Sequence, residues 1–221
     1  MATTTYTRAD SSVPRAGVSR AGSPVIAAAK AIPSQTGIWV AVSAIAMSFA
    51  ALTSALVVRE GSGSDWQRFV LPRILYLDTV ILMASSYTLE LARKRFTSAF
   101  AMRQEPSGSA SSELARSSGL YWLYMTQTLG LVFVIGQFLA WRSLAAQGLF
   151  LATSPSSSFF YLLTAMHGLH LLGGVLGLLY VGYRMRRNAR NAQSSLGTAA
   201  VYWHFVDLLW LYLLMVIAIR M

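Results

Sequence analysis

Cysteine is absent from this chain of 221 residues, and histidine occurs only three times. Without cysteine, the chain lacks the ligands for a disulfide framework, a thiolate zinc site, an iron–sulfur cluster or a CxxCH haem attachment. Three histidines are also too few for a multi-histidine metal cluster. The sequence therefore predicts that this chain holds no redox metal centre of its own.

Charge is scarce as well. Charged residues make up 12% of the chain, about half of the roughly 25% that is usual for a soluble domain. Hydrophobic residues make up 55%, and the mean hydropathy is +0.50. Because so few charges cannot cover the surface of a soluble protein of this size, we predict a membrane protein. Its eight acidic and eighteen basic residues, with a net charge of +10, are expected mostly where the chain touches water.

Five apolar segments are long enough to cross about 30 Å of hydrocarbon as helices that rise about 1.5 Å per residue. They lie at about 36–58, 69–92, 119–141, 158–183 and 199–219. Inside lipid each segment must satisfy its own backbone, and these runs do not alternate as the strands of a barrel do. We therefore predict an all-α fold, a bundle of five transmembrane helices within residues 36–221.

Residues 1–35 differ from the rest of the chain. They are rich in Ala, Ser, Thr and Arg, and they contain a single acid, Asp10. Because such a segment cannot bury a core, we predict a disordered basic tail. Its composition also fits an organelle transit peptide, whereas it has no secretory signal pattern.

The basic residues divide unequally between the two sides of the predicted helices. The tail and the connectors after the second and fourth helices share one side and hold thirteen bases, and the other side holds five. Because cytoplasmic loops are enriched in Lys and Arg, we predict that the N-terminus lies inside and the C-terminus outside. The net positive charge then reflects topology and attraction to anionic lipid headgroups rather than nucleic-acid binding.

Ionisable groups at bilayer depth cost about 2–4 kcal/mol each, so each one needs a partner or a function. Asp78 lies inside the second segment, and Arg73 is its expected partner beside Pro72. A proton or ion site at Asp78 is the alternative. Glu90 is expected to pair with Lys94, four residues later on the same helix.

The three histidines lie in the fourth and fifth segments. His167 and His170 are three residues apart, and His204 and Asp207 have the same spacing, which places each pair on one side of its helix. Three interpretations compete: a b-type haem between His204 and His167 or His170, a proton relay through His204, Asp207 and His170, and hydrogen bonds across packed helices with Asp207 as an acceptor. Aromatic bulk around His204 argues against haem, and the third interpretation is preferred. Small residues should also let a neighbouring helix approach closely: Gly168, Gly173 and Gly177.

Two motifs near the C-terminus resemble subunit III of the haem-copper oxidases. The first is Met166-His167-Gly168-Leu169-His170 followed by Gly173-Gly174, and the second runs from Tyr202 through Trp203, His204 and Asp207 to Trp210. Their order, spacing and position match that family, and weaker similarity extends over residues 36–220. It includes Thr36-Gly37-Ile38-Trp39, Asp78-Thr79, Ala84-Ser85-Ser86-Tyr87-Thr88, Gly136-Gln137 with Trp141, and the run Ser154–Phe160.

The resemblance implies a non-catalytic subunit of a cytochrome c oxidase, without haem or copper of its own, in a bacterial plasma membrane. Haem and copper would belong to its partners, subunit I and subunit II. The subunit would bind phospholipid and support assembly and proton uptake. No catalytic, cofactor or metal residue is assigned to this chain. The motif positions implied to make structural or lipid contacts are His167, Gly168, His170, Trp203, His204, Asp207 and Trp210.

The sequence departs from the family pattern at buried acids. Relatives carry an acid in the middle of the first helix, where this chain has Ile45, and a Glu near the end of the third, where it has Ala140. The usual Asn of the second helix is Asp78. The role in proton uptake that is tied to the first acid therefore does not transfer to this chain. Asp78 is a candidate for a compensating buried acid.

Other functions stay open from the sequence. A quinol oxidase subunit III and the accessory protein of nitric oxide reductases are related alternatives, because other subunits select the electron donor. From different classes, the alternatives are a free-standing b-type cytochrome and a transporter. A transporter would be expected to have an inverted repeat or broken helices around a midplane site, and neither is recognised in this sequence.

Overall fold

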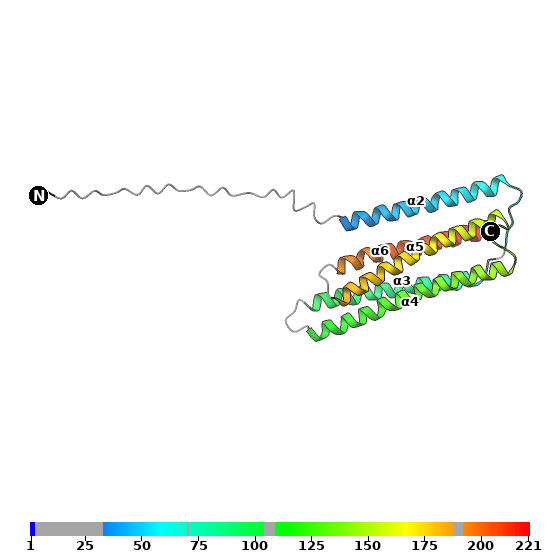
Figure 1. Cartoon of the computed structure of the whole chain (residues 1–221). Helices are drawn as coiled ribbons and strands as arrows, with labels where there is room; N and C mark the ends of the chain where they lie inside the picture. The colour runs from blue at the N-terminus through cyan, green and yellow to red at the C-terminus, as the bar shows by residue number, and fades with distance from the viewer. Residues whose placement is uncertain (3–32, 70, 104–108, 188–191) are drawn as a thin grey trace. The chain divides into compact units, whose positions relative to one another are not determined.

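The computed structural model describes residues 1–2, 33–69, 71–103, 109–187 and 192–221. These residues contain five helices: α2 Pro33–Ser62, α3 Ile74–Met102, α4 Ser109–Ala146, α5 Pro155–Arg186 and α6 Ala192–Arg220 (Figure 1). They contain no strand. Most of the predicted tail, residues 1–35, lies outside the described part of the chain.

All five helices are long and apolar enough to cross a membrane, which confirms the prediction of five transmembrane helices. α3 begins at Ile74, after Pro72, rather than at residue 69. At its other end it continues past the apolar segment to Met102, because the basic run Arg93–Arg95 extends the helix beyond the hydrocarbon. Each helix is continuous between its ends, so the described residues lack the broken helices expected at a transporter midplane site.

Four of the five helices form a closed ring. Their backbones approach each other closely between α3 and α4, α4 and α5, α5 and α6, and α6 and α3. The inside of the ring holds large side chains that are almost completely buried, and these include Trp203, Trp210, Phe133 and Phe160. The core of the protein is therefore the interior of this four-helix ring.

Helix α2 contacts the ring through side chains of α5 and α6. The ring of Phe49 meets the ring of His170 edge-on, with 5.7 Å between the centroids. The hydroxyls of Thr53 and Tyr212 share a hydrogen bond of 2.9 Å. Much of α2 is exposed, as at Met47, whose exposed fraction is 73%. A groove of about 500 Å³, lined mainly by apolar side chains, separates α2 from α6.

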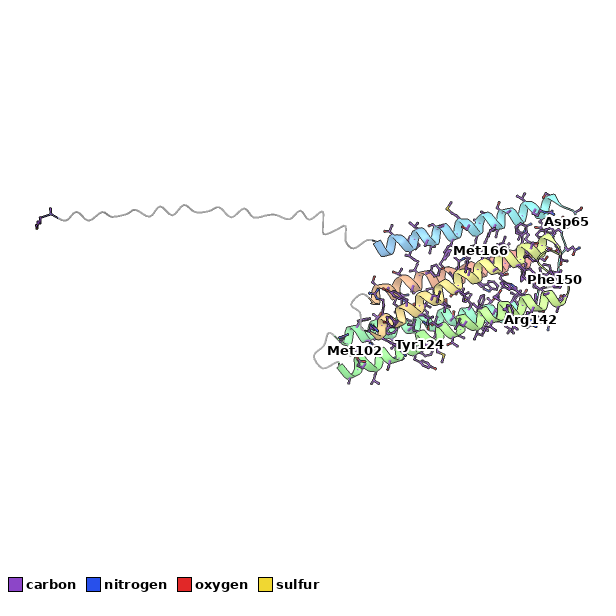
Figure 2. All side chains as sticks on the ribbon, viewed as in Figure 1. Asp65, Met102, Tyr124, Arg142, Phe150 and Met166 are labelled. Atoms are coloured by element: carbon purple, nitrogen blue, oxygen red, sulfur yellow. The ribbon has the colours of Figure 1, made fainter. Side chains whose placement is uncertain are left out.

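The last turn of α2 and the segment that follows it hold the end of α6. The carboxylate of Glu60 accepts a hydrogen bond from Arg220 at 3.1 Å and lies 3.7 Å from the guanidinium of Arg68. The indole of Trp66 donates to the backbone carbonyl of Arg220 at 3.0 Å. The indole thus pairs the carbonyl of Arg220, which the last turn of a helix otherwise leaves unpaired. We call this the α2–α3 end of the bundle, and Asp65 marks it in Figure 2.

The opposite end, which we call the α3–α4 end, carries Met102 (Figure 2). Here Arg116 of α4 donates to the carbonyl oxygens of Met185 and Arg186, at 2.8 and 2.7 Å. Because both carbonyls belong to the last turn of α5, the guanidinium both pairs them and places a positive charge at the negative end of the helix dipole. Arg116 therefore ties α4 to α5 at this end.

A capping box starts α5. The hydroxyl of Ser154 accepts from the Ser157 amide at 3.3 Å, and the Ser157 hydroxyl accepts from the Ser154 amide at 3.2 Å. Pro155 occupies the first helical position, where a missing N–H costs nothing. The preceding turn contains Gly148 at φ = +80°, a conformation that glycine adopts without steric cost.

The close approaches that we predicted at three glycines lie elsewhere. A Cβ atom at Gly168 or Gly177 would meet nothing within 4 Å, and one at Gly173 would come no closer than 3.8 Å to the Tyr202 hydroxyl. The tight positions are Gly174, where a Cβ would lie 3.2 Å from Trp203, and Gly130 on α4, where it would lie 2.7 Å from the same indole. The small residues thus make room for one tryptophan.

Replacing Gly130 tests this packing. We expect Gly130→Ala to lower the free energy of unfolding by about 1–3 kcal/mol, because the new methyl group overlaps a buried indole that has no free space to move into. Gly177→Ala is the matched control, since its methyl group enters open space, and it should leave the free energy equal or raise it by up to about 1 kcal/mol because alanine favours a helix. Unfolding in mixed detergent micelles, followed by circular dichroism, measures both. Equal stability of the two variants would contradict the proposed tight contact.

Candidate functional site

The C-terminal motif of α6 packs along a row of hydroxyl groups on α3. We call these seven residues the polar seam: Thr79, Ser85 and Ser86 of α3, and Trp203, His204, Asp207 and Trp210 of α6. The two helices run antiparallel, so later residues of α6 meet earlier residues of α3. Each of the four α6 side chains has a hydrogen-bond partner on α3, which is how polar groups become tolerable at membrane depth.

Trp203 lies in a slot across the ring. Its Nε1–H donates to the hydroxyl of Ser85 at 3.2 Å. Its six-membered ring reaches Gly130 of α4 and Gly174 of α5, which have no side chain to block it. The indole is 1% exposed. Trp203 therefore joins all four helices of the ring, and its one polar atom is paired.

Trp210 has the same role two turns further along α6. Its Nε1–H donates to the hydroxyl of Thr79 at 3.0 Å. Its ring meets Phe133 of α4 edge-on, with 4.9 Å between the centroids, and lies 5.1 Å from the ring of His167 on α5. Aromatic contacts of this kind add about 0.5–1.5 kcal/mol beyond burial. Trp210 thus also contacts every helix of the ring.

His167 is fully buried between aromatic rings. Its imidazole lies against Phe133, with 5.8 Å between the centroids, as well as against Trp210. Within the described residues neither of its ring nitrogens has a hydrogen-bond partner. We expected this side chain to bond across helices, and the structure instead uses it as part of the aromatic core.

Ser86 joins the two titratable groups of the α6 motif. Its hydroxyl lies 3.0 Å from Nδ1 of His204 and also donates to Oδ2 of Asp207. Asp207 is 4% exposed, and among the described residues its Oδ1 has no partner. The expected bond across helices therefore exists for His204, but Ser86 rather than a histidine is the donor to Asp207.

His170 faces away from this cluster. Its Nδ1 lies 2.7 Å from the carbonyl oxygen of Met166, one turn earlier on α5. Met166 is labelled in Figure 2. Its ring packs against Phe49 of α2, and its own carbonyl accepts from the hydroxyl of Tyr202 at 3.0 Å. A relay through His204, Asp207 and His170 is therefore not supported, because the structure directs His170 toward α2.

The structure does not arrange His167 or His170 as a partner of His204 across a porphyrin. A b-type haem requires two imidazoles that face each other across a gap the size of a porphyrin. Around His167 that space is occupied by Phe133 and Trp210, and His170 is directed toward Phe49 of α2. In the part of the chain that the structure describes, no three His, Asp or Glu side chains lie close enough together to hold a metal ion.

Asp78 has a different partner from the one expected. Its carboxylate is 2% exposed and accepts a hydrogen bond from Nε2 of Gln137 on α4 at 2.9 Å. A Cβ atom at Gly136 would collide with this carboxylate, so the glycine makes room for the pair. Arg73 does not reach Asp78: it precedes the first residue of α3, toward the water-facing end. Asp78 thus makes a hydrogen-bonded contact between α3 and α4, and the described residues give it no ion pair.

Other predicted positions are placed as follows. Glu90 pairs with Arg93 at 2.9 Å, three residues later, instead of with Lys94. Ala140, where the resemblance implied a Glu, is completely buried, and it lies one turn from Gln137. Ile45 is half-buried against the core. Both missing acids are therefore replaced by apolar packing.

Sequence reasoning assigned no role to Thr79, Ser85, Ser86 or Gln137, although it noted the segments that contain them. The spacing of Thr79 and Ser86 in the sequence could have indicated their role. Thr79 and Ser86 are seven residues apart, as are Trp203 and Trp210. Seven residues are almost two helical turns, so each pair marks one face, and two such faces can pack against each other.

Asp78 generates a prediction about stability. In Asp78→Asn the side-chain carbonyl still accepts from Gln137, while the new amide N–H₂ faces the Gln137 oxygen that has no partner among the described residues. We expect its free energy of unfolding to stay equal or to rise by about 1 kcal/mol. Asp78→Leu leaves the buried amide unpaired and should lower that free energy by about 1–3 kcal/mol. Detergent unfolding measures both, and an Asn variant as unstable as the Leu variant would contradict this assignment.

Comparisons with known proteins agree with the motif. The family described as "Cytochrome c oxidase subunit III" matches residues 38–220. The chain is 32% identical over 142 residues to "Probable cytochrome c oxidase subunit 3" of Mycobacterium tuberculosis, which covers 63% of this chain and 62% of that protein. It thus matches about three fifths of the length of that relative.

Two further relatives differ in coverage and in name. "Cytochrome c oxidase subunit 3" of Thermostichus vulcanus is 40% identical over 95 residues, which is 42% of this chain and 46% of that protein. "Probable quinol oxidase subunit 3" of Staphylococcus aureus is 26% identical over 184 residues, which is 80% of this chain and 84% of that protein. Because the family match covers most of the chain and both C-terminal motifs, this chain belongs to the cytochrome c oxidase subunit III family.

Proposed function

We propose that this chain is the non-catalytic subunit III of a proton-pumping haem-copper oxidase, a cytochrome c oxidase of the aerobic respiratory chain. The observation that carries the proposal is the polar seam. All four polar motif side chains of α6 are bonded to α3, and the two tryptophans fill the ring. A motif used in this way builds a scaffold and leaves haem and copper to the partner subunits.

The scaffold would lie in a bacterial plasma membrane with its N-terminus inside. The α3–α4 end carries the basic clusters around Arg93 and Arg184, and this distribution supports its placement on the cytoplasmic side. Subunit I would be the main partner, with subunit II and other respiratory subunits nearby. Exposed apolar side chains on every helix offer contact area for such partners or for lipid.

A quinol oxidase is the second candidate, because the relative from Staphylococcus aureus covers 80% of the chain. The difference lies in the electron donor, which another subunit binds. A complex isolated through a tag on this chain decides between the two: turnover with reduced cytochrome c supports the first candidate, and turnover only with a quinol supports the second.

Co-purification is the direct test of the proposal. We expect subunits I and II and their haem spectrum to accompany the tagged chain in mild detergent. After dissociation, haem should remain with the partners and be absent from this chain. Recovery of the chain without a haem-copper partner, or with haem bound to it alone, would contradict the proposal.

The polar seam predicts how one substitution acts in the complex. His204→Ala removes a bond between α3 and α6, so we expect lower yield and a shorter operational lifetime of the complex with little change in initial turnover. Ser48→Ala is the control, because the Ser48 hydroxyl bonds to Ala44 of its own helix. Oxygen consumption of the purified complexes over time gives both quantities. Complete loss of initial electron transfer in an intact His204→Ala complex would contradict a structural role.

We also propose that the groove between α2 and α6 holds a phospholipid chain. Ala50, Val57 and Met215 line it with apolar surface, and Arg220 lies at its α2–α3 end. Glu60 faces both Arg220 and Arg68, so one carboxylate meets two guanidinium groups and a positive charge remains there for a phosphate. Because the bilayer is as apolar as the groove, binding would depend on close packing of the acyl chain and on the phosphate contact.

Filling the groove tests this lipid site. Val57→Trp places a large ring in the groove, so we expect fewer phospholipids per purified complex. Val40→Trp is the control, because Val40 is exposed on α2 and does not line the groove. Native mass spectrometry counts the retained lipids. Equal lipid content in both variants would show that the groove is not the site.

A further inference from the structure

The cluster of Ser86, His204 and Asp207 contains a carboxylate without a cationic partner. Asp207 is 4% exposed, and it accepts a hydrogen bond from the hydroxyl of Ser86. In the described residues the five ion pairs involve other acids. One carboxylate oxygen, Oδ1, also has no partner there. A charged carboxylate at membrane depth is costly when it has so little compensation.

The hydrogen bonds of this cluster have a defined direction. A serine hydroxyl has one hydrogen to donate. When Asp207 is ionised, Ser86 must donate that hydrogen to Oδ2, so its oxygen must accept from Nδ1–H of His204, 3.0 Å away. When Asp207 is protonated, it donates to Ser86, which then donates to an unprotonated Nδ1. Both arrangements keep Nδ1 of His204, the hydroxyl of Ser86 and Oδ2 of Asp207 hydrogen-bonded, and they differ by the transfer of a proton along this chain of bonds.

The imidazole provides the connection toward the α3–α4 end. His204 is half-buried, and its Nδ1 lies 3.0 Å from the hydroxyl of Ser86 on α3. Glu90 lies one turn from Ser86 on α3, and the side chains of Glu90 and Arg93 are 41% and 42% exposed. A partly exposed ion pair therefore adjoins the imidazole where α3 passes from apolar to basic sequence.

The other titratable groups near the cluster lie on α3 and α5. On α3 they are Glu90 and Arg93. On α5 the titratable group is His167, whose ring packs against Trp210, one turn from Asp207. Neither ring nitrogen of His167 has a hydrogen-bond partner among the described residues. His170 is directed toward α2. Asp78 lies further along α3 and bonds to the amide of Gln137, which does not pass protons on.

We propose that Asp207 is a reversible proton-binding site inside the membrane, loaded from the α3–α4 end through His204 and the hydroxyl of Ser86. A proton from water binds Nε2 of His204. The Nδ1–H bond then breaks as its proton joins the oxygen of Ser86, and the O–H bond of Ser86 breaks as its proton joins Oδ2 of Asp207. The result is a neutral imidazole, an intact hydroxyl and a neutral carboxylic acid. No electrons are transferred, and the reverse steps unload the site.

The proposal goes beyond the function of a subunit III scaffold and does not depend on it. It assigns a ligand, the proton, to residues whose other role is to join α3 and α6. It also distinguishes two buried acids. Asp207 adjoins a hydroxyl and an imidazole, whereas Asp78 adjoins an amide, so proton exchange at Asp78 lacks this route.

Infrared difference spectroscopy of the full-length chain in phospholipid nanodiscs tests the proposal. Acidification should produce a C=O stretching band of a protonated buried carboxyl group, with the usual downshift in D₂O. Asp207→Asn should remove that band, whereas Asp78→Asn should leave it in place. If Asp207→Asn leaves the pH-dependent carboxyl bands unchanged, Asp207 does not bind the proton and the proposal is wrong.

Kinetics test the route. After a rapid pH jump, Ser86→Ala should slow the growth of the Asp207 band by about tenfold or more, and Ser86→Thr should restore the rate because it restores a hydroxyl. His204→Gln should slow it as Ser86→Ala does. Exposed Ser48→Ala serves as the control. Circular dichroism verifies folding, and if Ser86→Ala does not fold, the rate in His204→Gln tests the route. Equal rates in the parent and His204→Gln proteins would overturn the route.

Discussion

The contact between α3 and α6 is the interaction on which the rest of the structure depends. A helix in lipid gains little from burying apolar side chains, because the solvent is equally apolar, so association requires close packing and paired polar groups. Trp203 and Trp210 provide both. Each donates its single N–H to a hydroxyl of α3 and extends its ring toward α4 and α5. Without these anchors, α4 and α5 would have no filled interior around which to close the ring.

Glycine positions follow from the same requirement. A tryptophan can cross the ring only where the facing helices have no side chain, and Gly130 and Gly174 meet that condition. Gly136 makes room for Asp78 in a similar way. The glycines of the α5 motif that are spaced for helix contact, Gly173 and Gly177, have open space beside them. Spacing alone therefore does not identify which face of a glycine-rich helix is the packed face.

Fold and site differ in how far the sequence determines them. Hydropathy and length predict five membrane helices because crossing the hydrocarbon is a constraint on each segment separately. The partners of Asp78 and Glu90 were predicted wrongly because nearby charges on the same helix were favoured, whereas Gln137 lies on another helix and Arg93 is one residue closer than Lys94. Similarly, Ser86 could not be assigned from α3 alone, since its role depends on the register between two helices that are distant in sequence.

The position of α2 has a consequence for biosynthesis. Its contacts with the ring, from Phe49, Thr53 and Glu60, are all with α5 or α6, and the last two span 159 and 160 residues of sequence. Because α2 precedes both helices in the chain, these contacts can form only after α5 and α6 enter the bilayer. Until then α2 must be stable in lipid without them, which its almost uncharged sequence permits. Packing of α2 against the ring is therefore a late step of assembly.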